Sequence, residues 1–136
     1  AFAERIDGHF DTRGFGLFAV ERKDSGAFIG FTGLAVPRFD APFMPAVEIG
    51  WRLGHAHWGL GFATEAARAA LAHAFGPLGL EGIVSFTVPA NMRSRAVMEK
   101  IGMRHDPADD FDHPLLAPGD PLRRHVLYRI SKEEAA

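Results

Sequence analysis

A strand pattern, a glycine-rich break and an alanine-rich helix pattern follow one another in the middle of this chain, and this order restricts its fold. Residues 46–53 predict a β-strand, and residues 62–75 predict a helix that ends at Gly76. The glycines of the break fall within 54–61, and a second strand pattern follows at 81–88. A strand, a helix and a strand in this order favour a parallel pair joined by a right-handed crossover.

The first part of the chain predicts an antiparallel hairpin. Residues 15–23 and 27–35 are strand-like runs, and the turn residues 24–26 between them (DSG) are typical of a hairpin. Within residues 1–12, apolar side chains recur at a spacing of four, which favours the end of an amphipathic helix. An antiparallel hairpin ahead of a parallel pair indicates a mixed sheet.

The remaining segments complete an α+β pattern. Residues 37–45 contain three prolines and are expected to form a loop. Asn91 is expected to cap a second helix that continues through Ile101. Residues 107–121 form a second loop, and residues 125–130 form a last strand. We expect a mixed, mostly antiparallel and twisted sheet with flanking helices.

The composition fits one globular domain and excludes several kinds of site. The 136 residues are 47% hydrophobic and 24% charged, so we expect a single domain over residues 1–136. The absence of cysteine excludes thiol catalysis, a cysteine-ligated zinc and disulfides. A formal charge of −2 gives no overall attraction to nucleic acid or to an anionic membrane. No apolar run approaches a membrane span of about 20 residues, and no signal peptide is apparent, so we expect a cytoplasmic protein.

Gly59 and Gly61, directly before the alanine-rich helix, predict an anion site. The first backbone N–H groups of a helix have no internal partner, and the helix dipole adds about half a positive charge there. Glycines let a phosphate approach those donors, although a Gly-x-Gly is also typical of a simple tight turn. Two nucleotide motifs are excluded, because a dinucleotide fingerprint requires glycine where Thr64 stands and no Gly-Lys-Ser/Thr is present.

Two ordered motifs in this chain resemble those of the GNAT superfamily of acyl-CoA-dependent N-acyltransferases. Residues 58–63 (WGLGFA) are similar to the family's pyrophosphate loop, Arg/Gln-x-x-Gly-x-Gly/Ala, except that Trp58 replaces the first residue. Residues 91–103 (NMRSRAVMEKIGM) resemble the family's second-helix motif, Asn-x-x-Ser ending in Lys-x-Gly-Phe. Trp58 and the helix start at 63–66 resemble the branch of ribosomal-protein N-terminal acetylases.

The resemblance implies that the chain binds acetyl-CoA and needs no metal ion. The pyrophosphate would lie on the backbone N–H groups of residues 59–63, and the pantetheine arm would run through a V-shaped cleft between two splayed parallel strands. The implied cofactor-binding residues are Trp51, Arg52, Leu53, Trp58, Gly59, Leu60, Gly61, Phe62, Ala63, Thr64 and Asn91. Family members usually begin with a strand and a helix that this sequence lacks. We therefore expect an N-terminally incomplete domain, whose open edge strand favours a homodimer.

Glu48 is the expected base, and Ser94 the expected acid, for amide formation from a thioester. Glu48 alternates with Val47 and Ile49 along an apolar strand, and family members use a Glu here through a water. An exposed glutamate at the sheet surface is the other interpretation. The family's usual tyrosine on the second helix is Met98 here, which has no proton to give. Ser94, one turn earlier, either protonates the thiolate or helps to cap the helix.

Phe39, Phe43 and His113 are the expected acceptor-binding residues. The two phenylalanines lie in the proline-rich loop, which either covers an apolar acceptor pocket or packs as a satellite of the core. His113 lies in the later loop and either positions the amine or has a structural role. His55 and His57 have no third ligand nearby in sequence, so we expect loop surface there rather than a metal site.

We therefore predict direct transfer of an acetyl group from acetyl-CoA to a primary amine, with the oxyanion near the backbone N–H of Leu53. The acceptor is either a protein N-terminus or a small-molecule amine, and no nucleic-acid or membrane partner is expected. Arg93, Arg95 and Lys100 either reach the 3′-phosphate of the coenzyme or form a solvated helix face. The alternative function is a non-catalytic acyl-CoA-binding sensor or interaction module, which the absent tyrosine favours.

Overall fold

A computed structural model describes residues 2–6, 17–22, 24–37, 39–54 and 58–135 of the chain. These residues group into two compact units. The first unit contains residues 1–35 and 49–80, and the second contains residues 36–48 and 81–136. Each unit is described separately below.

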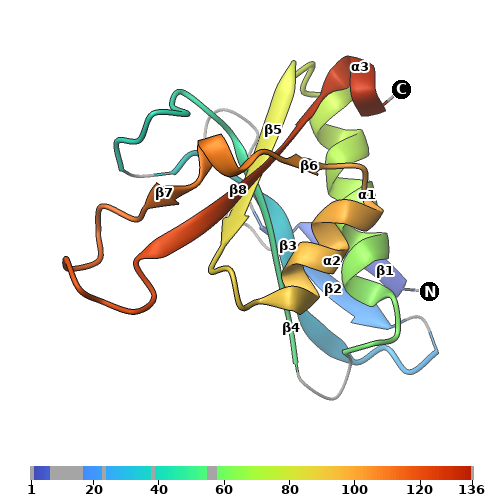
Figure 1. Cartoon of the computed structure of the whole chain (residues 1–136). Coiled ribbons are helices and arrows are strands. Elements are labelled where there is room, and N and C mark those ends of the chain that lie inside the picture. The colour runs from blue at the N-terminus through green and yellow to red at the C-terminus, as the bar shows by residue number, and fades with distance from the viewer. Residues whose placement is uncertain (1, 7–16, 23, 38, 55–57, 136) are drawn as a thin grey trace. The chain divides into compact units, whose positions relative to one another are not determined.

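The first unit is a run of antiparallel strands with one long helix (Figure 1). Its elements are β1 (Phe2–Ile6), β2 (Leu17–Arg22), β3 (Phe28–Ala35), β4 (Glu48–Leu53, of which Glu48 belongs to the second unit) and α1 (Phe62–Phe75). The hydrogen-bonded order is β1-β2-β3-β4, and both β1 and β3 run antiparallel to β2. The sequence between β2 and β3 forms the expected hairpin turn, in which Gly26 N–H donates to the Arg22 carbonyl oxygen at 2.7 Å.

Small side chains let α1 lie close to β3. Four alanines of this helix are fully buried, and the apolar cluster beneath it contains Val20, Ile29, Phe62 and Ala66 with Leu53 beside them. The Arg22 guanidinium lies over the Phe62 ring, 4.9 Å from the ring centre, and so covers one side of this cluster. The start of α1 is therefore held firmly by the core of the first unit.

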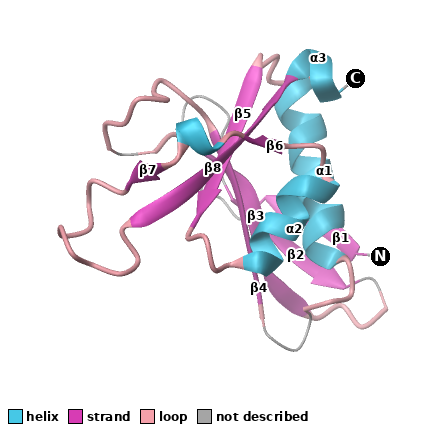
Figure 2. Ribbon diagram, viewed as in Figure 1, coloured by secondary structure: helices cyan, strands magenta, loops and turns pink. Residues whose placement is uncertain are grey.

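The second unit contains the last strands of the sheet, with helix α2 (Met92–Lys100) on one face and loops on the other. Its elements are β5 (Gly82–Thr87), α2 (Met92–Lys100), β6 (Arg104–His105), the 3-10 turn η2 (Pro107–Asp109), β7 (Phe111–Asp112), β8 (Arg124–Ser131) and α3 (Lys132–Ala135). β5 pairs antiparallel along its whole length with residues 126–131 of β8, side by side in Figure 2. Glu48 of β4 pairs in parallel with Val84 of β5, and the Val84 N–H donates to the Val47 carbonyl oxygen at 3.0 Å.

The register of this sheet assigns its side chains to two faces. Residues that pair across strands point to the same face, and neighbours along a strand alternate. Val84, Phe86 and Leu127 share one face, which the 36–47 loop and β7 cover. Tyr128 lies on the other face, where it bonds to side chains of α2. Since Glu48 pairs with Val84, its side chain belongs to the face opposite α2.

The fold class expected from the sequence is confirmed as α+β with a mixed, mostly antiparallel sheet. Helix α1 has the predicted bounds, and Asn91 caps α2 as expected. The helix expected within residues 1–12 is wrong over Phe2–Ile6, which form a strand that pairs with β2, and residues 7–12 lie outside the described residues. A spacing of four also places residues on one face of a strand, so this short pattern did not distinguish the two. None of the helices in the part of the chain that the structure describes is long and apolar enough to cross a membrane.

Candidate active site

The turn before α1 adopts a conformation that requires glycine. Gly59 and Gly61 have φ angles of 77° and 83°, in the left-handed region that other residues rarely enter. A Cβ atom added at either position would have no heavy atom of the described residues within 4 Å, so open space adjoins the backbone of both glycines in this part of the structure. Gly61 caps α1 without a side-chain acceptor among the described residues, and its carbonyl oxygen accepts the Glu65 N–H at 3.0 Å. These features are those of an anion-binding helix start.

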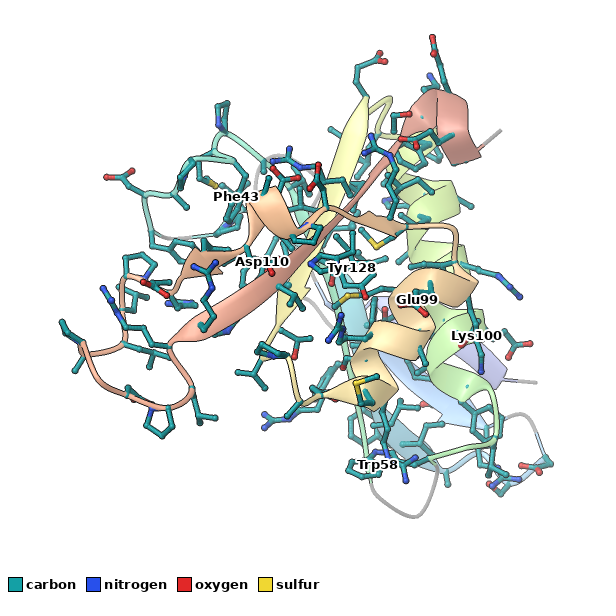
Figure 3. The ribbon with its side chains drawn as sticks, viewed as in Figure 1. Phe43, Trp58, Glu99, Lys100, Asp110 and Tyr128 are labelled. Carbon is teal, nitrogen blue, oxygen red and sulfur yellow. The ribbon has the colours of Figure 1, made fainter. Side chains whose placement is uncertain are left out.

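Trp58 connects this turn to the end of β4. Its indole Nε1–H donates to the Leu53 carbonyl oxygen at 2.9 Å, and the ring is 43% exposed (labelled in Figure 3). Leu60 between the two glycines is also exposed. The indole therefore ties the turn to the end of β4 through this hydrogen bond. His55 and His57 lie outside the described residues.

Glu48, at the first position of β4, is half-buried. Burial raises the pKa of its carboxyl group to about 7. None of the described residues forms an ion pair with this carboxyl that would offset the loss of water around its charged form. A carboxyl with a pKa near neutrality suits general-base chemistry at physiological pH.

The start of α2 holds Asn91 and Ser94 in fixed positions. The Asn91 side-chain oxygen accepts the Ser94 N–H at 3.2 Å, and its Nδ2 donates to Thr87 Oγ1 at 3.1 Å. Ser94 is half-buried one turn before the buried Met98. Asn91 therefore has the capping role that the sequence predicted. Ser94 belongs to the helix face of the unit, whereas Glu48 lies on the opposite face.

The chain's single tyrosine is occupied by a structural network. Tyr128 is 1% exposed, and its hydroxyl donates to Glu99 Oε2 at 3.0 Å (both labelled in Figure 3). The same hydroxyl accepts a hydrogen bond from Arg95 Nε at 3.2 Å. Arg95 also donates to the Pro89 carbonyl oxygen at 3.0 Å. The Arg95 guanidinium is thus engaged inside the second unit. The His105 ring stacks on Tyr128 with 5.0 Å between ring centres.

We expect Tyr128→Phe to leave kcat for acetyl transfer within about twofold, because this hydroxyl is engaged by Arg95 and Glu99. The same change should lower the free energy of unfolding by about 1–3 kcal/mol, since two side chains lose a buried partner. Urea unfolding followed by circular dichroism measures the stability, and release of free thiol measures the turnover. A large loss of kcat with unchanged stability would assign the tyrosine to catalysis instead.

Aromatic rings cover the face of the second unit that carries Glu48. Phe43 and Phe111 are buried, with ring centres 5.0 Å apart. Phe39 is half-buried, and its ring centre lies 4.4 Å from that of His113. Burial, together with the nearby His125, lowers the pKa of His113. Of the expected acceptor residues, Phe43 is mainly a packing residue, whereas Phe39 and His113 present partly accessible rings.

The expected site residues divide between the two units. Trp51, Arg52 and Leu53 belong to the first unit with the glycine turn, and Arg52 is exposed while the other two are half-buried. Glu48, Asn91 and Ser94 belong to the second unit with Phe39, Phe43 and His113. Sequence reasoning gave no role to His125 or Phe86, which lie on the Glu48 face beside His113. The alternation of side chains along the last strand indicated which of its residues share a face with His125. Which side of the sheet this face lies on depends on the pairing with β5.

Across the described residues, no group of three or more His, Asp or Glu side chains is arranged to hold a metal ion.

Residues 1–104 of the chain match the acetyltransferase (GNAT) domain family. The chain therefore belongs to the GNAT acetyltransferase family, whose fold the strands and helices above reproduce. It is 36% identical over 114 residues to FsC-acetyl coenzyme A-N(2)-transacetylase of Aspergillus fumigatus, covering 80% of this chain and 48% of that protein.

Solved structures agree with this assignment. An acetyltransferase from Agrobacterium tumefaciens has 35% identity and a TM-score of 0.64, over 86% of this chain and 61% of that one. Mycobacterium smegmatis RimJ, solved in complex with CoA-disulfide, has 28% identity and a TM-score of 0.69, over 88% of this chain and 54% of that one. The chain spans about half the length of the curated relatives that it matches.

Proposed function

We propose that this chain is an acetyltransferase domain that moves an acetyl group from acetyl-CoA to a primary amine. The glycine turn at the start of α1 carries the proposal, because open space adjoins its backbone and α1 begins there without a side-chain cap. The Aspergillus relative named for acetyl coenzyme A and the RimJ structure with CoA-disulfide support the choice of coenzyme.

The coenzyme would be bound mainly through the backbone. Its pyrophosphate would accept hydrogen bonds from the N–H groups of residues 59–63, and a diphosphate matches the positive end of the helix dipole. The proposed coenzyme-binding residues remain Trp51, Arg52, Leu53, Trp58, Gly59, Leu60, Gly61, Phe62, Ala63, Thr64 and Asn91. The positive φ angles of the two glycines support this use of the turn.

Glu48 and Ser94 have the proposed catalytic roles. Glu48 would take a proton from the acceptor ammonium, through a water, so that the neutral nitrogen attacks the thioester carbon. A C–N bond forms and the C–S bond breaks; the thiolate takes a proton from Ser94, which regains one from the nitrogen of the new amide, so that the second ammonium proton ends on the thiol. The backbone N–H near Leu53 would stabilise the oxyanion. The two side chains belong to opposite faces of the second unit.

The acceptor is proposed to be a small-molecule amine or a protein N-terminus. The 28% identity to RimJ supports a place near the ribosomal-protein N-terminal acetylases. Phe39, Phe43 and His113 are the proposed acceptor contacts. The homodimer and the cytoplasmic location stay predictions from the sequence.

Gly61→Ala should raise the Kd for coenzyme A by about 10-fold or more. A Cβ at a φ of 83° strains the turn and enters the space that the pyrophosphate would occupy. Gly26→Ala is the matched control, because Gly26 has a φ of 70° and equally open surroundings but lies in the β2–β3 hairpin. Isothermal titration with coenzyme A compares the two variants. Equal losses of affinity in both would remove the turn from the binding site.

Titration with acetyl-CoA, followed by a thiol-release assay over a panel of amines, tests the function as a whole. Binding together with amine-dependent release of one thiol per acetyl group is the expected result. Binding without release under any amine would instead indicate a non-catalytic module that senses or docks through acyl-CoA.

A further inference from the structure

His113 and His125 have complementary hydrogen-bonding states. His113 Nδ1 accepts the Leu115 N–H at 3.2 Å, so its neutral ring carries the proton on Nε2. His125 Nδ1 lies 3.1 Å from the Arg123 carbonyl oxygen, which only accepts, so this nitrogen carries the proton. The free Nε2 of His125 is therefore an acceptor, and the free Nε2 of His113 is a donor. The two ring centres are 5.1 Å apart.

Partly accessible aromatic rings surround this pair. Phe39 lies 4.4 Å from His113, and Phe86 lies 6.2 Å from His113 and 6.0 Å from His125, measured between ring centres. All four side chains are half-buried, and the buried Phe111 supports them from within the unit. These four rings, Phe39, Phe86, His113 and His125, are called the ring surface below.

The ring surface and the Glu48 carboxyl share one face of the second unit. Glu48 pairs with Val84, and Phe86 is two residues further along β5 on the same face. Phe86 pairs with Leu127, and His125 precedes Leu127 by two residues on β8. The period of two along each strand therefore aligns the base with the rings.

The charges around the ring surface favour a ligand with one positive charge. Asp109, the last residue of η2, pairs with Arg129, and Asp110 pairs with His105. Asp112 is shared by Arg123 and Arg124. Asp40, which follows Phe39, is exposed, so water screens its carboxylate.

Glu48, by contrast, is half-buried and forms no ion pair with the described residues. A single ammonium near Glu48 is therefore matched, whereas a polyamine would need further carboxylates that are already paired or are screened by water.

We propose that the ring surface binds the acetyl acceptor, and that this acceptor is a small primary amine with an aromatic body and a hydroxyl group. This inference rests on the acetyl transfer proposed above. Phe39 and Phe86 would contact the aromatic body, and His125 Nε2 would accept a hydrogen bond from the hydroxyl. A partly buried nitrogen that can accept a hydrogen bond discriminates against a substrate analogue without the hydroxyl, because that analogue leaves the nitrogen unpaired.

Tyramine, 2-phenylethylamine and spermidine test the proposal as acceptors. We expect kcat/KM for tyramine to exceed that for 2-phenylethylamine by about 10-fold and that for spermidine by more. His125→Asn keeps a donor in place of Nδ1 toward the Arg123 carbonyl but removes the Nε2 acceptor, so it should bring the first ratio close to one. Phe39→Ala should raise KM for both aromatic amines. His73→Asn, on α1 of the first unit, should leave the ratio unchanged.

Direct binding separates this inference from the proposed function. Saturation-transfer NMR should detect tyramine on the protein loaded with coenzyme A, and His125→Asn should weaken that signal. Tyramine binding that depends on His125, without thiol release, would support the ring surface and overturn the catalytic proposal. Thiol release with spermidine preferred, or an unchanged tyramine ratio in the folded His125→Asn variant, would overturn the ring surface alone. Neither binding nor release of any amine would overturn both.

Discussion

Replacing Glu48 by glutamine should lower kcat for acetyl transfer by about 100- to 10,000-fold, and the Kd for coenzyme A should stay within about twofold. Glutamine keeps the shape of the side chain but cannot accept the proton of the ammonium. Thiol release measures kcat, and calorimetric titration measures Kd. Glu81→Gln is the control, because Glu81 is exposed just before β5 in the same unit. Full turnover in the Glu48 variant would remove this carboxyl from the mechanism.

The pH profile should identify the same group. Only the charged carboxylate acts as a base, and burial raises the pKa of Glu48 to about 7. The rate constant kcat/KM should therefore rise with pH along a limb centred near 7 and become level above it. This limb should be absent from the residual activity of Glu48→Gln. A limb centred near 4.5, the ordinary pKa of a glutamate, would mean that the carboxyl is well solvated in the working enzyme.

The contribution of Glu48 to the stability of the parent protein should change with pH in the opposite direction to its contribution to activity. The folded protein holds the Glu48 proton up to about pH 7, whereas the unfolded chain loses it near 4.5. The folded state thus binds more protons within this window, so the Glu48 contribution to stability falls as pH rises through it.

Above pH 7 the variant should be more stable than the parent by about 1–3 kcal/mol, and below about pH 4.5 the advantage should vanish. Urea unfolding at pH 8 and near pH 4 measures the difference. An advantage that is equal at both pH values would point to packing rather than to a buried charge.

Local signals in the sequence predicted the part of the site that depends on local geometry. Gly59, Gly61 and Asn91 act through the backbone of their own turns, so the residue types alone indicated a helix start and a cap. Glu48 was also accessible to prediction, because alternation along an apolar strand placed a carboxyl where burial is costly.

The partners of distant residues could not be predicted in the same way. Tyr128 bonds to Arg95 and Glu99, about thirty positions earlier, and only the register of β8 against β5 brings them together. His125 was left without a role for the same reason, since its proximity to His113 depends on the pairing of β7 with β8. Strand β1 was missed because five residues are too few to distinguish a helix period from a strand period.

Gly30→Ala should lower the free energy of unfolding by about 3 kcal/mol or more, or prevent folding. A Cβ atom at Gly30 of β3 would overlap the Arg52 carbonyl oxygen of β4 and lie 2.8 Å from the Leu53 Cα. Both neighbours are backbone atoms, so no side-chain rotation relieves the overlap. The two strands would have to separate, and the Gly54 N–H bond to the Ile29 carbonyl oxygen, now 2.9 Å, would lengthen.

The same change should also reduce coenzyme affinity, because Leu53 holds the glycine turn through the indole of Trp58. A shift of β4 at Arg52 and Leu53 would be passed to this turn along that hydrogen bond. Gly50→Ala is the matched control on β4, since a Cβ there has no heavy atom within 4 Å. Urea unfolding should show a large loss for Gly30→Ala and little change for Gly50→Ala. Equal stability of the two variants would mean that β3 and β4 tolerate a wider spacing at this point.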